Sequence, residues 1–266
     1  PILFATGNFL YHKIYIPRLP TVIRYFNRKG WDGVGLNFRG CSGTPNRILR
    51  AYHSGETRDV DFVIQEIASR KQYRRLVLVG FSLGGNVTLK YVGERGSDLP
   101  DLLKAAVGVS VPCHLESSSY QLMKGFNQLY LKNFLRDLKA KVRAKEPQYP
   151  GAMDYEAAYN ARNFIEFDDV CTGPINGFKG AVDYWTKSSC LQFLPNIKIP
   201  ALLLNARDDS FLSDLCYPVK LAQAHSHLHL EIPKYGGHVG FGPGDQQMDY
   251  WSDRRIYEFV EQVLGE

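Results

Sequence analysis

The sequence predicts an α/β fold in which a mostly parallel, doubly wound sheet carries an all-helical insertion. Short apolar runs alternate with helical patterns along most of the 266 residues, which is typical of a parallel sheet with helices on both faces. The interval 112–195 breaks this alternation, because it contains helical patterns and many aromatic residues but no convincing strand. We therefore predict a core of residues 1–111 and 196–266 with a helical cap of residues 112–195.

Six short apolar runs are predicted as strands. Three of them, Leu76–Gly80, Ala105–Ser110 and Ala201–Asn205, are continuously apolar, as expected for strands that are buried on both faces of a sheet. The other predicted strands are Ile2–Ala5, Val34–Phe38 and His227–Ile232.

Helical patterns separate these strands. Within the insertion we predict helices at Tyr120–Ala144 and Ala157–Phe164. Insertions of this kind often form lids over a site, and the alternative is a peripheral helical pair without a gating role. The predicted core helices are Leu19–Lys29, Glu56–Arg70, Gly84–Glu94, Ser213–Ala224 and Trp251–Leu264.

The composition is mildly basic, with a formal net charge of +5. The densest basic run, Lys132–Lys145, is typical of the solvated face of a helix. We therefore expect no nucleic-acid partner, and contact with a membrane surface is allowed by the charge but not indicated by it.

The five cysteines are widely spaced and form no CxxC pair or zinc-ligand spacing. We interpret them as free thiols of a reducing compartment, and with no signal-peptide pattern and no apolar run that could span a bilayer we expect a cytoplasmic protein. The chain begins at Pro1 without a methionine, so its natural N-terminus is left open.

The strongest local motif is Gly80–Gly85 (GFSLGG), which joins a predicted strand to a predicted helix. A serine in this setting lies on a tight, strained turn where glycines relieve crowding and the helix N-terminus stabilises negative charge. A lone GxSxG is a weak pattern, and its alternative is an ordinary turn serine. The position between strand and helix favours Ser82 as a nucleophile.

A serine hydroxyl needs a base to remove its proton. His238 lies in the glycine-rich segment Tyr235–Phe241 after the last predicted strand, so it should reach the carboxyl edge of the sheet, where sites of this architecture form. His225, His227 and His229 alternate along one predicted strand, as metal ligands on one face of a strand would. We interpret them instead as residues of a partly exposed edge strand. We therefore predict His238 as the base and no metal.

The base needs a carboxylate to orient it. Asp208 and Asp209 directly follow the predicted strand Ala201–Asn205, and the pattern Asp-x-apolar-apolar favours Asp209. The alternatives are that Asp208 has this role or that both are turn residues. The chain order Ser, Asp, His is the order found in hydrolases built on such a sheet.

Together these motifs resemble the α/β-hydrolase family of YheT and the plant embryogenesis-associated proteins, which is related to mammalian membrane-associated abhydrolases. The resemblance extends from Gly30 to the C-terminus. It is carried by Asn37–Gly43 (NFRGCSG), Tyr52–Thr57 (YHSGET), Gly80–Asn86 (GFSLGGN), Ile165–Asp169 (IEFDD), Asp208-Asp209 and Gly236–Phe241 (GGHVGF).

The resemblance implies an ester hydrolase that acts on carboxylic esters, such as acyl glycerols, acetyl esters or phospholipids. It also implies a triad of Ser82, Asp209 and His238. The segments Arg39–Gly43 and His53–Thr57 would line the base of the site, and we interpret them as a scaffold for the triad loops.

One departure from the family concerns the oxyanion hole. The family carries a His-Gly pair after its third strand, whereas here Thr6-Gly7 follows Ile2–Ala5. If Ile2–Ala5 is that strand, the family's first strands are absent and Gly7 supplies one N–H. Alternatively, Pro1–Pro17 resembles the family's extreme N-terminus and a block is lost before Gly30. The Leu83 N–H is the other predicted donor, and losing one donor costs about 100- to 1000-fold in turnover.

These observations predict a serine carboxylic ester hydrolase that works through an acyl-enzyme on short- to medium-chain acyl or lipid esters, without metal or cofactor. Two alternatives are a thioesterase or amidase with the same triad and a catalytically weak binding or scaffold protein. The expected partner is a small-molecule ester or lipid. Neither the natural substrate nor the oligomeric state follows from the sequence.

Overall fold

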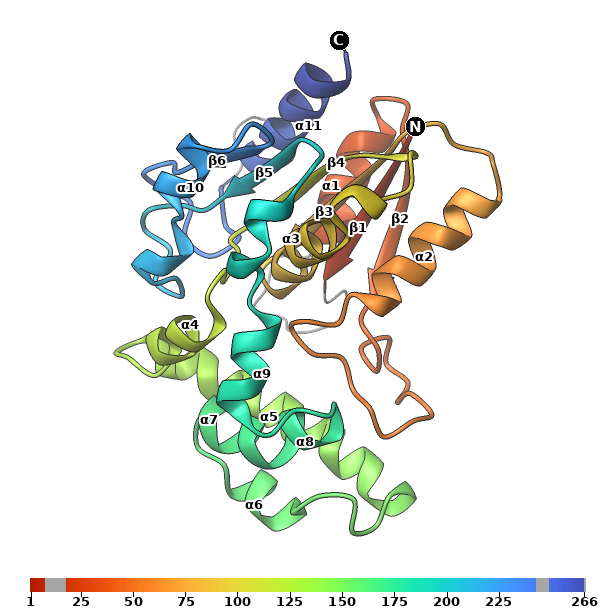
Figure 1. Ribbon diagram of the computed structural model, residues 1–266. Helices are drawn as coiled ribbons and strands as arrows, with labels where there is room; N and C mark the ends of the chain where they lie inside the picture. The colour runs from red at the N-terminus through yellow and green to blue at the C-terminus, as the bar shows by residue number, and fades with distance from the viewer. Residues whose placement is uncertain (8–17, 243–248, 266) are drawn as a thin grey trace.

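A single parallel sheet organises the core of the protein. The computed structural model describes residues 1–7, 18–242 and 249–265. Within them, six strands pair in the order β2-β1-β3-β4-β5-β6, and every pairing is parallel (Figure 1). All six predicted strands are confirmed. Their bounds are β1 Ile2–Gly7, β2 Asp32–Asn37, β3 Leu76–Phe81, β4 Leu103–Val109, β5 Ala201–Leu204 and β6 Leu228–Glu231.

Strand β1 lies inside the sheet, between β2 and β3. Thr6 is opposite Gly80, the residue with which the GFSLGG motif begins. This position agrees with the interpretation that places Thr6-Gly7 beside the serine turn. The competing interpretation of Pro1–Pro17 falls largely on residues 8–17, which lie outside the described residues.

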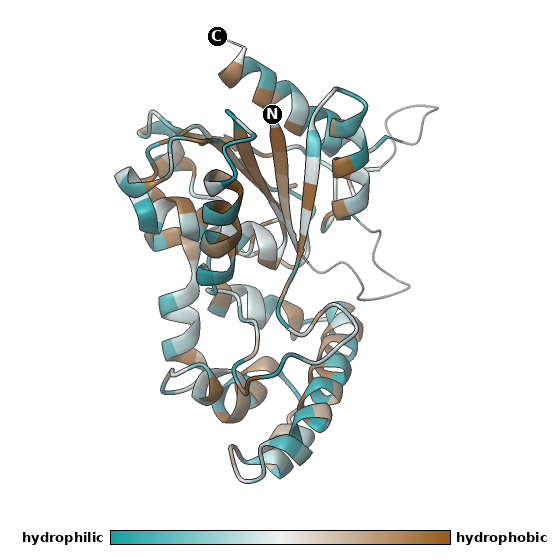
Figure 2. Ribbon diagram, turned by 90° about the vertical axis from the view of Figure 1, so that its right-hand side faces the viewer, coloured by the Kyte–Doolittle hydropathy of each residue, from teal (hydrophilic) through white to brown (hydrophobic). Residues whose placement is uncertain are grey.

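Side chains alternate along the strands and build a core on each face of the sheet. In β1, Ile2 and Phe4 point to the face covered by α2 (Arg58–Ser69) and α3 (Leu83–Arg95), whereas Leu3 and Ala5 point to the face covered by α1 (Arg18–Asn27) and α11 (Trp251–Leu264). Figure 2 shows the apolar strands enclosed between these helices. Burial on both faces explains why the central strands are continuously apolar.

One predicted core helix is wrong. The expected helix Ser213–Ala224 is a 3₁₀ turn, η6 (Asp214–Cys216), followed by the short helix α10 (Val219–Gln223). Pro218 separates them, because proline lacks an N–H donor and disfavours helical backbone at the residue before it. Two further 3₁₀ turns are η1 (Gly96–Asp98), in a connection of the core, and η5 (Leu194–Asn196), which spans the predicted end of the insertion.

The interval 112–195 contains helices and no strand, and every residue in it is described. It lies beyond the carboxyl ends of the strands, below the sheet in Figure 1. Its division from the core as a separate unit stays a prediction. Its elements are α4 (Leu115–Leu122), α5 (Asn127–Lys145), η2 (Glu146–Gln148), α6 (Tyr155–Asn160), α7 (Phe164–Phe167), the π-helical turn η3 (Asp168–Thr172), α8 (Gly173–Ile175), α9 (Ala181–Ser188) and η4 (Cys190–Gln192).

Both helices predicted in this interval are interrupted. The expected helix Tyr120–Ala144 breaks at Gly125, whose positive φ of 48° ends the α4 segment before α5 begins. The expected helix Ala157–Phe164 breaks before Asn163, whose side chain accepts the backbone N–H of Glu166 and caps α7.

Candidate active site

Ser82 lies on the turn between β3 and α3, with φ of 54° and ψ of −119°. This backbone conformation is strained for a residue with a side chain and is characteristic of functional sites. The turn is so tight that a Cβ atom at Gly80 would collide with the carbonyl of Gly84, and one at Gly84 would collide with the carbonyl of Thr6. Gly80 and Gly84 are therefore required by the geometry that exposes the serine.

The structure brings the three predicted site residues together. The Ser82 Oγ lies 2.8 Å from His238 Nε2, and His238 Nδ1 lies 2.9 Å from Asp209 Oδ2. The imidazole stacks on Phe211, with ring centroids 4.3 Å apart. A hydroxyl, an imidazole and a buried carboxylate thus form one hydrogen-bonded chain.

The geometry distinguishes the two adjacent aspartates. Asp209, only 3% exposed, also accepts the backbone N–H of Phe211 through its second oxygen. Asp208 instead accepts the backbone N–H of Gly237, one residue before the imidazole. Asp209 therefore contacts the imidazole, while Asp208 fixes the loop that carries it.

The loop after β6 is held in a strained shape that aims His238 at the serine. Val239 and Phe241 both have positive φ angles, of 56° and 40°. The Val239 N–H donates to Ser110 Oγ at 2.9 Å, which ties this loop to the end of β4. Strained backbone persists only where surrounding contacts hold it, so the position of the imidazole is set by the fold.

The predicted oxyanion donors lie at the same turn. Leu83 directly follows the serine as the first residue of α3. The end of β1 is bound to the turn by Thr6, whose hydroxyl bonds to the carbonyl of Gly84 at 3.2 Å and to Thr88 Oγ1 at 3.2 Å. The Thr6–Gly7 peptide therefore lies against the turn, and the donor role of Gly7 stays a prediction.

A cavity of about 290 Å³ opens above Ser82. Its floor includes Ser82, Leu83 and His238 of the core, and its walls come from both the core and the insertion. Most lining side chains are apolar, as in typical small-molecule sites. The insertion contributes Leu115, Ser119 and Leu122 from α4, Phe134, Asp137, Leu138 and Lys141 from α5, and Phe164, Asp168, Thr172, Tyr184 and Trp185 from later turns.

Asn86 joins three segments beneath the site. Its side-chain amide donates to the carbonyl of Ser54 at 2.7 Å and to that of Ser188 at 2.8 Å, and its Oδ1 accepts the N–H of Cys190 at 2.9 Å. The side chain is fully buried and every one of these contacts spans a long sequence separation. The last residue of the GFSLGGN motif therefore anchors the serine helix to the YHSGET loop and to the end of the insertion.

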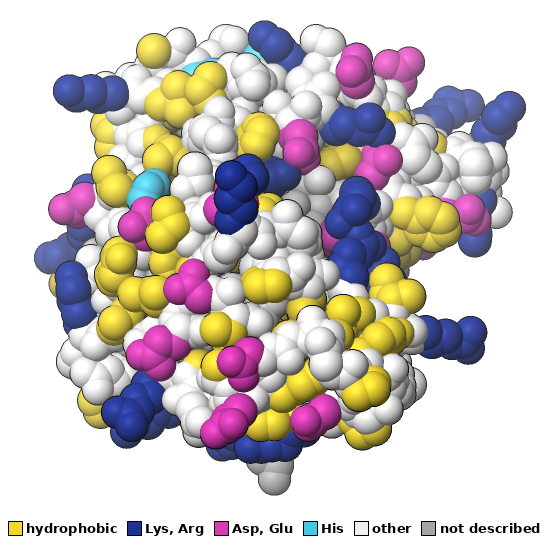
Figure 3. All heavy atoms as spheres, turned by 60° about the horizontal axis from the view of Figure 1, so that its bottom comes forward, with side chains coloured by type: hydrophobic (Ala, Val, Ile, Leu, Met, Phe, Trp, Pro, Cys, Tyr) yellow, Lys and Arg dark blue, Asp and Glu magenta, His cyan; other side chains and the backbone are white. Residues whose placement is uncertain are grey.

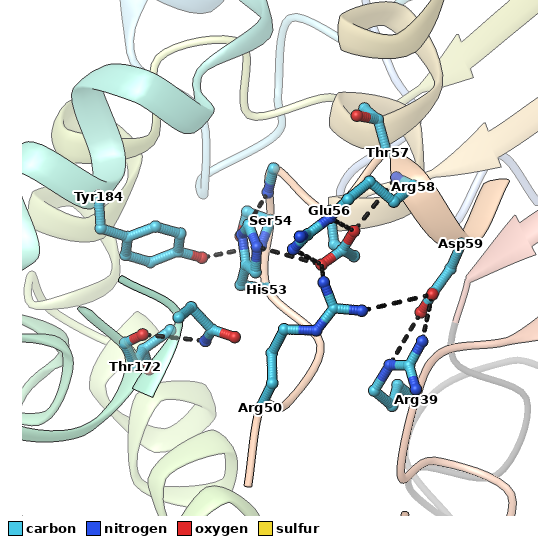
Figure 4. A network of polar contacts seen from close by, with 12 residues as sticks. Arg39, Arg50, His53, Ser54, Glu56, Thr57, Arg58, Asp59, Thr172 and Tyr184 are labelled. Carbon is cyan, nitrogen blue, oxygen red and sulfur yellow. Dashed lines mark hydrogen bonds and ion pairs between the residues drawn. The ribbon is translucent and has the colours of Figure 1, made fainter. Parts of the chain in front are cut away.

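The YHSGET loop contains a buried polar network (Figure 4). Glu56, 3% exposed, forms ion pairs with Arg50 at 3.1 Å and Arg58 at 2.8 Å, and His53 Nε2 lies 3.6 Å away. Burial raises the pKa of Glu56, but hydrogen bonds from His53 and Arg58 and the arginine charges outweigh burial and hold that pKa well below its usual range.

Two further contacts extend this network. Arg39 pairs with Asp59, and the Tyr184 hydroxyl of α9 accepts the backbone N–H of Ser54 at 2.8 Å (Figure 4). The network therefore links the loop to both the core and the insertion. These contacts fit the interpretation of Arg39–Gly43 and His53–Thr57 as a scaffold for the loops that carry the triad.

Sequence reasoning gave Asp168 no role, although it belongs to the IEFDD stretch. It lies in the π-helical turn η3 and lines the cavity, and its Oδ2 accepts the indole N–H of Trp185 at 2.9 Å. Burial raises the pKa of Asp168 to about 7. A single π-helical turn is frequent at functional sites, and this irregular turn could not be predicted from helical periodicity.

The remaining histidines and the cysteines form neither a metal site nor a disulfide among the described residues. Among the described residues, no three His, Cys, Asp or Glu side chains converge as a metal site would require. His225 Nδ1 accepts the backbone N–H groups of His227 and Leu228, and the His229 ring packs on Phe259. All five cysteines are buried and none forms a disulfide. No helix in the described ranges has the length and hydropathy to cross a bilayer.

Comparison with protein families identifies this architecture. A family model described as alpha/beta hydrolase fold matches residues 1–245. The chain belongs to the α/β-hydrolase family. Within it, the chain is 37% identical over 240 residues to YheT of Escherichia coli, covering 89% of this chain and 70% of that protein. The resemblance inferred from the motifs is confirmed.

More distant relatives carry more specific names. The chain is 30% identical over 238 residues to phospholipase ABHD3 of Mus musculus and 26% identical over 262 residues to monoacylglycerol lipase ABHD2 of Homo sapiens. It spans only 57% and 61% of the length of these two proteins, although they cover 88% and 91% of this chain.

Solved structures agree on the fold. The Pyrococcus furiosus esterase Pf2001 superimposes with a TM-score of 0.63 at 14% identity, covering 99% of this α/β-hydrolase and 82% of that chain. The monoacylglycerol lipase of Paleococcus ferrophilus gives a TM-score of 0.59 at 17% identity, with coverages of 98% and 94%.

Proposed function

We propose that this α/β-hydrolase is a serine carboxylic ester hydrolase. The observation that carries the proposal is the hydrogen-bonded chain from Ser82 through His238 to buried Asp209, at the floor of a mainly apolar cavity. Geometry of this kind lets the imidazole remove the serine proton while the carboxylate fixes the tautomer and stabilises the imidazolium. It also argues against a purely non-catalytic binding role.

The proposed reaction has two steps. Ser82 Oγ forms a bond to the ester carbonyl carbon while its proton passes to His238 Nε2. The oxyanion is held by the Leu83 N–H and the Gly7 N–H, and then the carbon–oxygen bond to the alcohol breaks as His238 protonates the leaving oxygen. Water repeats the sequence on the acyl-enzyme, giving its proton to His238 and releasing the acid and the serine hydroxyl.

The proposed substrates are acyl or lipid esters. The apolar lining from α4 and α5 suits an acyl group, and two relatives are named as a phospholipase and a monoacylglycerol lipase. In this proposal the insertion acts as a cap that supplies the acyl pocket. The length of acyl chain that the enzyme accepts depends on the shape of the cavity.

A fluorophosphonate probe tests the nucleophile. We expect covalent labelling of the wild type and none of Ser82→Ala, while Ser69→Ala, an exposed serine on α2, should label like the wild type. An unlabelled wild type, or equal labelling of Ser82→Ala, would contradict the proposal. Turnover of p-nitrophenyl butyrate against butyryl thioesters and anilides then separates an esterase from a thioesterase or amidase with the same triad.

A further inference from the structure

A second cavity, of about 230 Å³, lies beside the one that holds Ser82. It is a partly open cavity between the loop of residues 39–51 and the insertion, chiefly α5 and η3. Most of the side chains around it are apolar. Those from the insertion are Leu138, Ala140, Val142, Ala144, Met153, Phe167, Cys171 and Ile175.

The two cavities are neighbours and share four lining residues. Tyr52, Leu138, Lys141 and Thr172 line both of them. The Tyr52 ring stacks on Phe38, with centroids 5.7 Å apart, and the Lys141 ammonium lies 4.4 Å above the Tyr52 ring. The shared side chains of Tyr52, Leu138, Lys141 and Thr172 are therefore the groups whose rotation would connect the two spaces.

The cations around the second cavity are engaged by the protein. The Lys145 ammonium donates to the carbonyl oxygens of Ile48 at 2.6 Å and Leu49 at 2.8 Å. Arg39 pairs with Asp59, and the Lys141 ammonium lies 2.8 Å from the Cys41 sulfur. Such side chains present their methylene stems to a cavity while their charged ends are bound elsewhere. The cavity therefore suits an apolar occupant better than an anion.

We propose that the second cavity is a distal subsite for a long acyl chain. The ester carbonyl would lie at Ser82, the first methylenes in the 290 Å³ cavity, and the terminal methylenes would pass Leu138 and Thr172 into the 230 Å³ cavity. This inference rests on the proposed ester hydrolysis and deepens it, because it extends the substrate class from short- and medium-chain esters to long-chain esters.

Filling the second cavity tests the subsite. Ala144 lines only this cavity and is on the exposed side of α5, so Ala144→Trp should fold and occupy the space. Each methylene withdrawn from an apolar site weakens binding about fourfold. We expect kcat/KM for p-nitrophenyl palmitate to fall at least tenfold, with p-nitrophenyl butyrate changed less than about twofold. Lys132→Trp, on α5 but lining neither cavity, should change neither value.

A binding measurement separates this inference from the proposed chemistry. In the Ser82→Ala background, we expect the dansyl amide of dodecylamine to bind at least tenfold more tightly than that of butylamine. Ala144→Trp and Ile175→Trp should each reduce this preference, because they fill only the second cavity. If this chain preference and its loss are seen while the protein with Ser82 intact hydrolyses no ester, the subsite stands and the proposed function fails. Equal effects on long and short chains, or no effect of either tryptophan, would overturn the subsite.

Discussion

Two adjacent aspartates follow β5, and only Asp209 faces the imidazole. A carboxylate there fixes the tautomer of His238, whereas Asp208 binds the backbone of Gly237. We expect Asp209→Asn to lower kcat on p-nitrophenyl butyrate on the order of 10⁴-fold, because the amide favours the wrong tautomer. Asp208→Asn keeps an oxygen acceptor for Gly237 and should lose less than about tenfold. Similar losses in both variants would contradict the assignment.

Asp168 gives the cavity wall a pH-dependent stability. Its pKa of about 7 lies above the ordinary aspartate value because the carboxyl is buried. Between about pH 4 and pH 7 the unfolded chain releases this proton while the folded chain keeps it, so the free energy of unfolding falls as the pH rises. Above about pH 7 Asp168 is ionised in both states, so its contribution to the free energy of unfolding no longer changes with pH.

Asp168→Asn removes this titration while keeping an oxygen for the indole N–H of Trp185. In urea unfolding, we expect the variant to gain stability relative to the wild type between pH 5 and pH 8, on the order of 2 kcal/mol. The exposed turn residue Asp101 offers a matched control, since Asp101→Asn should show no such gain. A constant difference across the range would show that Asp168 does not titrate there.

The sequence predicted those site residues that can be recognised from their immediate neighbours in the chain. Ser82 and His238 each lie in a short glycine-rich motif between regular elements, so a few neighbouring letters reveal them. Asn86 and Asp168 bind partners that are distant in the chain or packed across the insertion. No local pattern encodes such contacts, which is why their roles required the structure.

At the scale of elements, α3 is coupled to its surroundings through Asn86. Three buried backbone groups, from Ser54, Ser188 and Cys190, depend on this one amide. Asn86→Ala leaves them without partners, and each unsatisfied buried group costs about 1–3 kcal/mol. We expect the free energy of unfolding in urea to fall by roughly 3 kcal/mol or more.

A surface substitution gives the comparison. Asn163→Ala removes the cap of α7 and an exposed hydrogen bond to the Glu166 carboxylate, and the lost cap should cost about 1 kcal/mol. If Asn86→Ala were no more destabilising than Asn163→Ala, the three contacts would not act as an anchor. The rate of ester hydrolysis should fall as well, because Ser82 is the N-cap residue of α3.

Element boundaries were predicted well where turns are simple and poorly where one residue interrupts a helical pattern. Trp251–Leu264 has the predicted bounds, because no glycine or proline interrupts it. Gly125 and Pro218 each divided an expected helix. Both residues are visible in the sequence, so the missed signal was their position within otherwise helical runs.

At the scale of the whole molecule, the cavity exists only because two parts of the chain face each other. The core supplies the reacting groups, and the residues 112–195 supply about half of the lining residues. On the face of the insertion that Figure 3 shows, basic, acidic and hydrophobic side chains are interspersed.

A ligand that fills the cavity should couple these two parts. A dodecyl fluorophosphonate bound to Ser82 would contact α4, α5 and α9, whereas α6 contributes no residue to either cavity. We expect backbone amide exchange to slow in α4, α5 and α9 of the labelled protein and to stay unchanged in α6, because local opening of the walls now requires loss of acyl contacts. Unchanged amide exchange in all four helices would instead show that the insertion is peripheral. A cap that holds the acyl chain must lose its contacts with that chain before its helices can open.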